Sequence, residues 1–206
     1  MVNWGYASFG GGAEIPPEVT DAGNGNFVRG VQVASTQEGF VLLREDGTVR
    51  AWGQHFATLP TRATSTTAIG FVRGERMFTN KESCAMLRRD GTVVVFGDAT
   101  KGGALPSGTF VESGLSYATH HTFSRVVDIA STGEAFSALR QDGTVWSWGD
   151  AGKGGEMSSS GSGYHSMPQE LIFTSYFGFV ETVSVAATYF SFCALRTDGS
   201  VRCVSW

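Results

Sequence analysis

The sequence predicts an all-β repeat protein: a β-propeller, in which small antiparallel sheets (blades) stack around an axis. Two observations support this prediction. A hairpin motif built around Asp-Gly occurs four times, and no segment between the copies shows a convincing helical periodicity. The copies are spaced by 44, 52 and 56 residues, and they are centred on Asp46-Gly47, Asp90-Gly91, Asp142-Gly143 and Asp198-Gly199.

Each motif predicts a hairpin with a three-residue turn. In the first copy, Leu43 lies three residues before Asp46 and Val49 lies three residues after it. A turn of Glu45-Asp46-Gly47 makes this Leu and Val direct cross-strand partners, whereas a two-residue turn would place them on opposite faces. The glycine then takes the left-handed conformation that ends such a turn. The same register pairs Phe40 with Trp52, Phe136 with Trp148 and Cys193 with Cys203.

A further strand is expected before each hairpin. Similar segments begin at Val31 (VQVAST), Val127 (VDIAST) and Val183 (VSVAAT), and ERMFTN is a degenerate copy. Each unit therefore contains three or four short strands with apolar residues on both faces. Such sheets need cover on both sides, and blades packed face to face supply it.

Composition excludes several classes. The 206 residues are 41% hydrophobic with 28 glycines, which is typical of a turn-rich globular chain and not of a disordered one. A formal charge of −4 gives no basic field for nucleic acid. No apolar run is long enough to span a bilayer, and the segment after Met1 does not resemble a secretory signal. We therefore expect no nucleic-acid partner, no direct membrane insertion and, with the organelle unknown, an intracellular location.

The pattern FxAL-x-x-DGTVxxWG, followed by a glycine pair, resembles the repeat of the regulator of chromosome condensation (RCC1) over nearly the whole chain. The resemblance implies an RCC1-like β-propeller. Such propellers usually have seven blades, and this chain holds four hairpins and an opening fragment, VNWGYASFGGG. We therefore expect a partial or small propeller that pairs with another chain, stays open under a partner, or closes as a smaller ring.

The repeats divide one domain, 1–206, into five segments. We expect residues 1–27 to form the tail of a truncated blade and a loop. Repeat 1 covers 28–70, repeat 2 covers 71–123, repeat 3 covers 124–179, and an incomplete repeat 4 covers 180–206.

The sequence shows no group of residues with the types and spacing of a known catalytic or metal site, so we expect no catalytic residues, no cofactor and no metal. The adjacent His120 and His121 lie in a loop without neighbouring acidic or thiol ligands. Cys193 and Cys203 are either a redox pair or, the interpretation we favour, two reduced thiols that fill a tight layer between blades.

Two sets of residues are candidates for binding a partner. Four arginines stand two residues before the turn aspartates and would form an arc on one rim, where they either receive an acidic partner or bond locally to their own turns. Aromatic residues in the long loops either recognise a protein or pack back onto the propeller. The candidates are Arg44, Arg88, Arg140, Arg196, Tyr117, Tyr164, Phe173, Tyr176 and Phe177.

The sequence thus favours a non-catalytic protein-binding scaffold, or an accessory subunit of a larger assembly, with a protein partner or a second copy. The resemblance to RCC1 implies an alternative, guanine-nucleotide exchange on a Ran-type small GTPase. An enzyme-inhibitor propeller is a third possibility.

Overall fold

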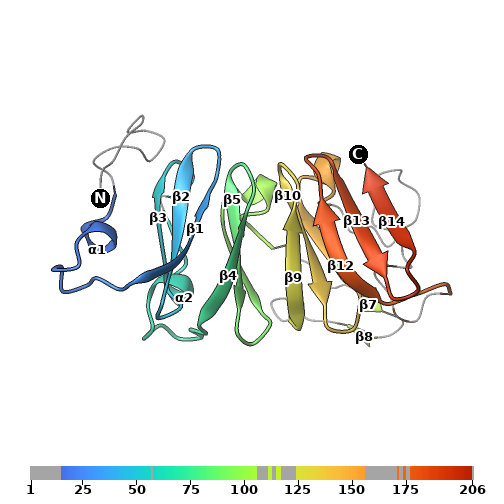
Figure 1. The fold of residues 1–206 in the computed structure, drawn as a ribbon, viewed down its shortest axis with the longest axis horizontal. Helices are drawn as coiled ribbons and strands as arrows, with labels where there is room; N and C mark the ends of the chain where they lie inside the picture. Colours follow the sequence, from blue (N-terminus) through green and yellow to red (C-terminus); the bar gives the residue numbers. More distant parts are fainter. Residues whose placement is uncertain are drawn as a thin grey trace.

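The computed structural model describes residues 15–56, 58–105, 111–112, 115–116, 124–155, 171, 174 and 177–205. Four three-stranded antiparallel sheets follow one another along the chain (Figure 1). Blade 1 contains β1 (Gly30–Ser35), β2 (Gly39–Arg44) and β3 (Val49–Gly53); blade 2 contains β4 (Gly74–Thr79), β5 (Ser83–Arg88) and β6 (Val93–Gly97); blade 3 contains β9 (Val126–Ser131), β10 (Ala135–Arg140) and β11 (Val145–Gly149); and blade 4 contains β12 (Thr182–Ala187), β13 (Ser191–Arg196) and β14 (Val201–Ser205).

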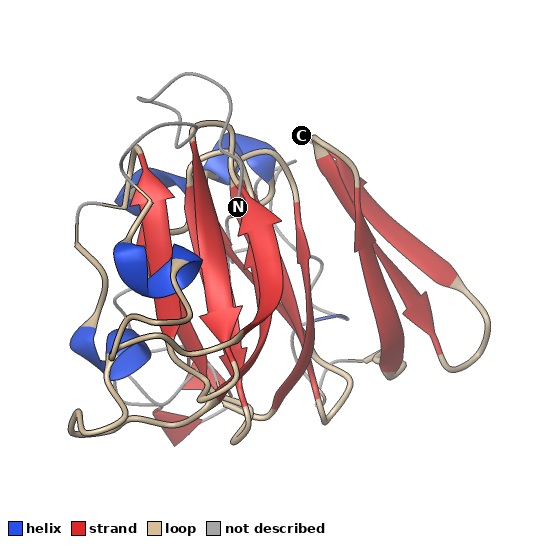
Figure 2. Cartoon of the chain, turned by 60° about the vertical axis from the view of Figure 1, so that its left-hand side comes forward, coloured by secondary structure: helices blue, strands red, loops and turns tan. Residues whose placement is uncertain are grey.

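The blades form an open row. The first strands of successive blades contact one another, β1 with β4, β4 with β9, and β9 with β12. Blades 1 and 4 lie at opposite ends of the row (Figure 1), and Figure 2 shows blade 4 at the end of the stack. The prediction of an all-β, partial propeller is confirmed. The repeat boundaries remain a prediction.

The turns have the predicted register. Leu43 pairs with Val49 and Phe40 with Trp52, and the same holds for Phe136 with Trp148 and Cys193 with Cys203. Gly47 has a φ of +80°, which an L-residue rarely adopts, so a glycine closes the turn without a Cβ penalty. Asp46 stabilises the same turn, because its Oδ1 accepts hydrogen bonds from Thr48 N at 2.9 Å and Thr48 Oγ1 at 2.6 Å.

The hydrophobic core lies between the blades. One cluster joins Leu43 and Val49 of blade 1 to Phe96 of blade 2. A second joins blades 2 and 3, and a third joins blades 3 and 4. Each blade therefore covers its neighbour with one face, as the two-sided apolar pattern of the strands predicts. At roughly 25 cal/mol per Å² of buried apolar area, these layers hold the row together.

Backbone hydrogen bonds also cross between blades. At one end of the sheets, Gln37 N donates to Lys81 O at 2.7 Å, Lys81 N to Gly133 O at 3.1 Å, and Gly133 N to Tyr189 O at 3.1 Å. These four residues occupy the same place in successive blades. The stacking therefore has a fixed register as well as apolar burial.

The loops contain short elements that the strand pattern does not predict. They include α1 (Pro17–Thr20), α2 (Thr61–Thr64), the 3₁₀ turns η2 (Ala99–Lys101) and η3 (Ala151–Lys153), and a two-stranded sheet of β7 (Val111–Glu112) and β8 (Leu115–Ser116). The glycine pairs of the sequence follow the 3₁₀ turns. Gly102 ends η2 and Gly154 ends η3, both in the left-handed conformation.

One interpretation from the sequence is wrong. Cys193 and Cys203 form a disulfide and are not two reduced thiols. Their Cα atoms lie 4.0 Å apart as direct cross-strand partners, which is close enough for the sulfur atoms to bond. They lie on the same face of blade 4 as Leu195 and Val201, which are 42% and 55% exposed, and Cys203 is itself exposed, so within the described residues they do not fill a layer between blades. Cys84 is a free, buried cysteine.

Candidate interaction surface on the arginine rim

The arginine rim is the end of the blades where the Asp-Gly turns lie. Each repeated arginine is the last residue of the second strand of its blade, directly before the turn. Arg44 and Arg196 are 4% and 5% exposed, and the other two are half-buried. The four guanidinium groups are therefore built into the rim and do not extend from it.

Three of these arginines bond to their own turn. Arg44 Nε donates to Thr48 Oγ1 at 2.8 Å and Arg88 Nε donates to Thr92 Oγ1 at 2.7 Å. Arg140 donates from Nη1 to Thr144 Oγ1 at 3.2 Å and pairs with Asp142 at 3.2 Å. A guanidinium that donates several directed hydrogen bonds to its own turn is less free to contact a partner, so these bonds mainly stabilise the turn.

In blade 4 the corresponding turn shows the same carboxylate chemistry. Asp198 Oδ1 accepts from Ser200 Oγ at 2.6 Å and from Ser200 N at 2.9 Å. These hydrogen bonds hold the pKa of Asp198 below its ordinary value, because they favour the charged form. The turn aspartates thus act as local acceptors that fix the loop.

Each arginine also binds the loop that enters its own blade. The acceptors are main-chain carbonyl oxygens upstream along the chain, 18 residues away for Arg44, Arg88 and Arg196 and 16 residues away for Arg140. Arg88 Nη1 donates to Gly70 O at 3.0 Å, and Arg196 Nη2 donates to Gly178 O at 2.9 Å. The equivalent acceptors of Arg44 and Arg140 are Asn26 O and Ser124 O, each at 3.3 Å. The arginines therefore fasten one loop per blade to the rim.

Two of the fastened loops present a large apolar side chain to solvent. Ile69, directly before Gly70, is 101% exposed, and Phe177, directly before Gly178, is 98% exposed. Full burial of a side chain of this size stabilises a protein by about 1.5–3 kcal/mol. The complete exposure of these two side chains, next to anchored backbone, therefore marks them as candidate contacts for a partner. Ile69 and Phe177 are called the apolar tips below.

The predicted binding residues divide into three groups. Phe177 is exposed, and its contact with a partner stays a prediction. The four arginines lie on one rim, and their direct contact with a partner stays a prediction. Tyr117, Tyr164, Phe173 and Tyr176 lie outside the described residues. Ile69 was not expected, although its place before a glycine repeats that of Phe177.

The opposite rim carries ion pairs between blades that the sequence did not suggest. Lys101 of blade 2 reaches Glu134 of blade 3 at 2.5 Å and Asp150 at 3.1 Å. The hydrogen bond from Lys101 lowers the pKa of Glu134, although burial acts in the opposite direction. The GDATKGG and GDAGKGG segments supply Asp98, Lys101 and Asp150, so their regular spacing contributes to contacts between blades.

One group on this opposite rim has the residue types of a metal site. His55, Glu82 and Asp98 bring one ligand atom each within 4.8 Å of one another. His55 Nε2 also lies 3.4 Å from Glu38 Oε2. His55 is exposed, and Asp98 Oδ1 already accepts hydrogen bonds from Thr100. The group therefore matches an interblade charge contact of the Lys101 type as well as it matches an ion site.

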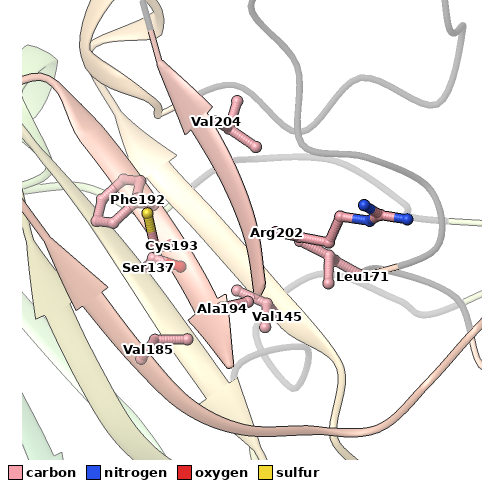
Figure 3. Close-up of a pocket in the computed structure, with 9 residues that line it drawn as sticks. All are labelled: Ser137, Val145, Leu171, Val185, Phe192, Cys193, Ala194, Arg202 and Val204. Atoms are coloured by element: carbon pink, nitrogen blue, oxygen red, sulfur yellow. The ribbon is translucent and has the colours of Figure 1, made fainter. Parts of the chain in front are cut away.

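A narrow gap, too small to hold a water molecule, lies between blades 3 and 4 (Figure 3). Ser137 and Val145 line it from blade 3, and Phe192 and Val204 line it from blade 4. Within the described residues, Ser137 Oγ has no hydrogen-bond partner. Apart from Ser137 and Arg202 the lining is mainly apolar, and no general base lies among the lining residues, so we interpret this space as a packing gap of the interface.

Comparison with protein-family models and with curated proteins gave no match. Solved structures do match. Human WBSCR16 aligns with 84% of this chain and 47% of its own, at 20% identity and a TM-score of 0.52. Prp20p of Saccharomyces cerevisiae, which is yeast RCC1, aligns with 84% of this chain and 43% of its own, at 18% identity and 0.54. This chain has an RCC1-like propeller fold.

A third solved structure also matches this chain. The ectodomain of the receptor kinase CR4 from Physcomitrella patens aligns with 89% of this chain at 16% identity, with a TM-score of 0.53. The chain spans less than half the length of each of these structures.

Within its described part, no helix is long and apolar enough to cross a bilayer.

Proposed function

We propose that this RCC1-like chain is a non-catalytic protein-binding scaffold, or an accessory subunit of a larger assembly, and that it binds its partner through the arginine rim. The observation that carries the proposal is the pair of apolar tips. Ile69 and Phe177 are fully exposed, and each precedes a carbonyl that a buried or half-buried arginine holds.

The tips have the properties of interface anchors. A bulky apolar residue on a rigid support loses little conformational entropy when it enters a partner's pocket. Arg88 and Arg196 supply that rigidity, and the stacked blades beneath supply a fixed distance between the tips. Phenylalanine and isoleucine gain from desolvation and not from phosphate contacts. A protein partner therefore fits this rim better than a nucleic acid, in agreement with the net charge of −4.

The solved relatives support a protein partner in a general way. The structure of Prp20p was described with its binding to Gsp1p and histones, and another structure shows Kap60 bound to yeast RCC1. Those partners are known only for those proteins. They show that this fold can present surfaces to other proteins.

Photo-crosslinking tests the proposal. A photoreactive amino acid replaces Phe177, and the protein is irradiated in an extract of its source. We expect one crosslinked protein, whose capture by the wild-type chain falls at least tenfold in the Ile69→Ser/Phe177→Ser double variant. The matched control is Val31→Ser, because Val31 is 56% exposed but lies on β1 and not on a fastened loop. Equal capture by all three chains would disprove binding through the tips.

The fold of Prp20p also favours a second candidate, guanine-nucleotide exchange on a Ran-type GTPase. A fluorescent-nucleotide release assay decides it. Acceleration by the wild-type chain would support exchange, and an unchanged release rate would leave the scaffold as the function.

A further inference from the structure

The two outer faces of the row differ from the inner interfaces, although they carry the same side chains. The trailing face of a blade is defined here as the side turned toward the next blade, and the leading face as the side turned toward the preceding one. On the trailing faces of blades 1 to 3, the repeated leucine and valine are between 0% and 5% exposed. In blade 4 the equivalent Leu195 is 42% exposed and Val201 is 55% exposed.

Backbone packing shows the same difference. A Cβ on Gly143 of blade 3 would lie 2.9 Å from the Cα of Glu181 in blade 4, and Gly143 O accepts a hydrogen bond from Thr182 N at 3.1 Å. Gly47 and Gly91 meet the following blade in the same way. A Cβ on Gly199 of blade 4 would meet no atom within 4 Å.

The leading face of blade 1 also exposes apolar side chains whose equivalents in blades 2 and 3 are buried. Val33 is 64% exposed, whereas the equivalent Met77 and Ile129 of the next two blades are each 4% exposed. Phe40 and Trp52 stack at 5.7 Å and are half-buried. Their equivalents in blade 3, Phe136 and Trp148, stack at 5.3 Å, and these two are 0% exposed against blade 2.

We propose that a second copy of this chain docks head to tail, so that the trailing face of blade 4 packs on the leading face of blade 1 of the other copy. Leu195 and Val201 then cover Val33, Phe40 and Trp52, as Leu87 and Val93 share one core with Ile129, Phe136 and Trp148 inside the chain.

The backbone can continue in the same register. The carbonyl oxygen of Gly199 takes the place of Gly143 O, and the amide of Gly30 in the second copy takes the place of Thr182 N. At the opposite rim, Tyr189 N faces Gln37 O of the second copy, as Gln37 N donates to Lys81 O within the chain. The interface thus repeats a contact that the chain already makes three times.

A pair of chains also suits the size of the ring. The chain matches 47% of WBSCR16 and 43% of Prp20p, so two copies together approach the length of either structure. With four blades each, two copies give eight blades, one more than the seven that the resemblance to RCC1 implies. A head-to-tail contact made twice closes a ring with twofold symmetry and leaves no apolar face exposed.

Light scattering after size exclusion tests the pairing on the whole chain. We expect a wild-type mass of twice 21.9 kDa. Leu195→Asp on one face and Val33→Asp on the other each place a charge in the apolar contact, and each is expected to weaken association about tenfold or more. Val127→Asp is the matched control, because Val127 is 47% exposed on blade 3 but belongs to neither outer face. Circular dichroism of each variant verifies that it folds.

Mixing the variants identifies the geometry. The Leu195→Asp variant keeps the leading face of blade 1 unchanged, and the Val33→Asp variant keeps the trailing face of blade 4 unchanged. An equimolar mixture of the two variants should therefore form pairs that neither variant forms alone. A wild-type mass of one chain at all concentrations would overturn the proposal. Pairing by Val33→Asp alone would also overturn it, because like faces would then be in contact. A wild-type mass above two chains would overturn the closed ring.

Discussion

Arg196 donates a hydrogen bond of 2.9 Å from Nη2 to the carbonyl oxygen of Gly178, the residue that follows the exposed Phe177. The arginine stands at the end of β13 and the glycine lies 18 residues earlier. A side chain from the hairpin therefore sets the position of a loop that precedes the blade. The equivalent bond from Arg88 to Gly70 O holds the loop of Ile69.

Arg196→Met is expected to release this loop. Methionine keeps the apolar volume of the stem but cannot donate, so Gly178 O loses a hydrogen bond from a charged group, and the free energy of unfolding should fall by roughly 1–3 kcal/mol. Amide exchange at residues 177–181 should speed up more than elsewhere. The comparison is Arg62→Met, since Arg62 is exposed and should change stability by less than about 0.5 kcal/mol. Unchanged exchange at 177–181 would contradict the anchoring role.

Acid is expected to weaken the contact between blades 2 and 3. The hydrogen bond from Lys101 lowers the pKa of Glu134 in the folded state. The contribution of the Lys101–Glu134 ion pair to the free energy of unfolding is therefore complete above the unfolded pKa of about 4.3. This contribution is lost as the pH falls through the lower pKa of the folded state. Lys101→Met should cost about 0.5–1 kcal/mol at pH 7, and this difference from wild type should shrink below pH of about 4.

Urea unfolding at a series of pH values measures this effect. Lys153→Met is the matched control, because Lys153 takes the same place in the next blade but lies over the Phe190 ring at 4.2 Å. Its cost should not depend on pH across the acid range. A cost of Lys101→Met that stays constant down to pH 3 would show that the ion pair adds nothing to stability.

Sequence patterns predicted the features that depend on local geometry. Leu43 and Val49 can be cross-strand partners on one face only if the turn between them has an odd number of residues. The pairing register of the hairpin could therefore be predicted from the sequence. Stacked blades followed from strands that are apolar on both sides. The exposure of Ile69 could not be predicted in this way, because a hydrophobic residue in a loop is exposed or buried according to contacts distant in sequence.

The chemistry of the site was harder to predict for the same reason. An arginine near an aspartate can pair with it, cover a strand or meet a partner, and only the position of Gly70 or Gly178 shows that it binds a carbonyl. The small side chains at positions equivalent to Cys193 and Cys203 suggested a buried layer. Among the described sheets blade 4 is the last one, so the two cysteines lie on its outer face, where they are joined by a disulfide.

Thiol labelling should separate the three cysteines. In the native, unreduced protein we expect no reaction with iodoacetamide, because Cys193 and Cys203 are bonded and Cys84 is 0% exposed. Burial also raises the pKa of the Cys84 thiol far above its usual range, which removes the reactive thiolate. After mild reduction, mass spectrometry should find two labels. Two labels without reductant would show that the cysteines are free thiols.

Reduction is also expected to lower stability. The disulfide closes a loop with a sequence separation of 10, and a loop of that length restricts the unfolded chain by about 2–3 kcal/mol. Urea unfolding with and without reductant measures the loss, and the Cys193→Ala/Cys203→Ala variant should show it without reductant. Cys84→Ser serves as the control for the reagent, since its stability should respond to reductant as that of the wild type does.

Two glycines with the same backbone conformation should respond differently to alanine. Gly143 and Gly199 have φ values of +75° and +79°, so an added Cβ costs each about 1–2 kcal/mol through the backbone. Only at Gly143 does the Cβ also meet the next blade, at 2.9 Å from Glu181 Cα. We expect Gly143→Ala to lose roughly 2–5 kcal/mol in total, because blades 3 and 4 must move apart.

The measurement is urea unfolding in the Leu195→Asp background, which keeps the chain monomeric and separates folding from pairing. Gly199→Ala should then show only the backbone cost. In the otherwise wild-type chain, Gly199→Ala should in addition weaken self-association, since the second copy would bring Arg29 to the place that Glu181 takes beside Gly143. Equal losses for the two variants in the monomeric background would contradict the role of the next blade. An unchanged pairing constant for Gly199→Ala would count against the head-to-tail contact at this turn.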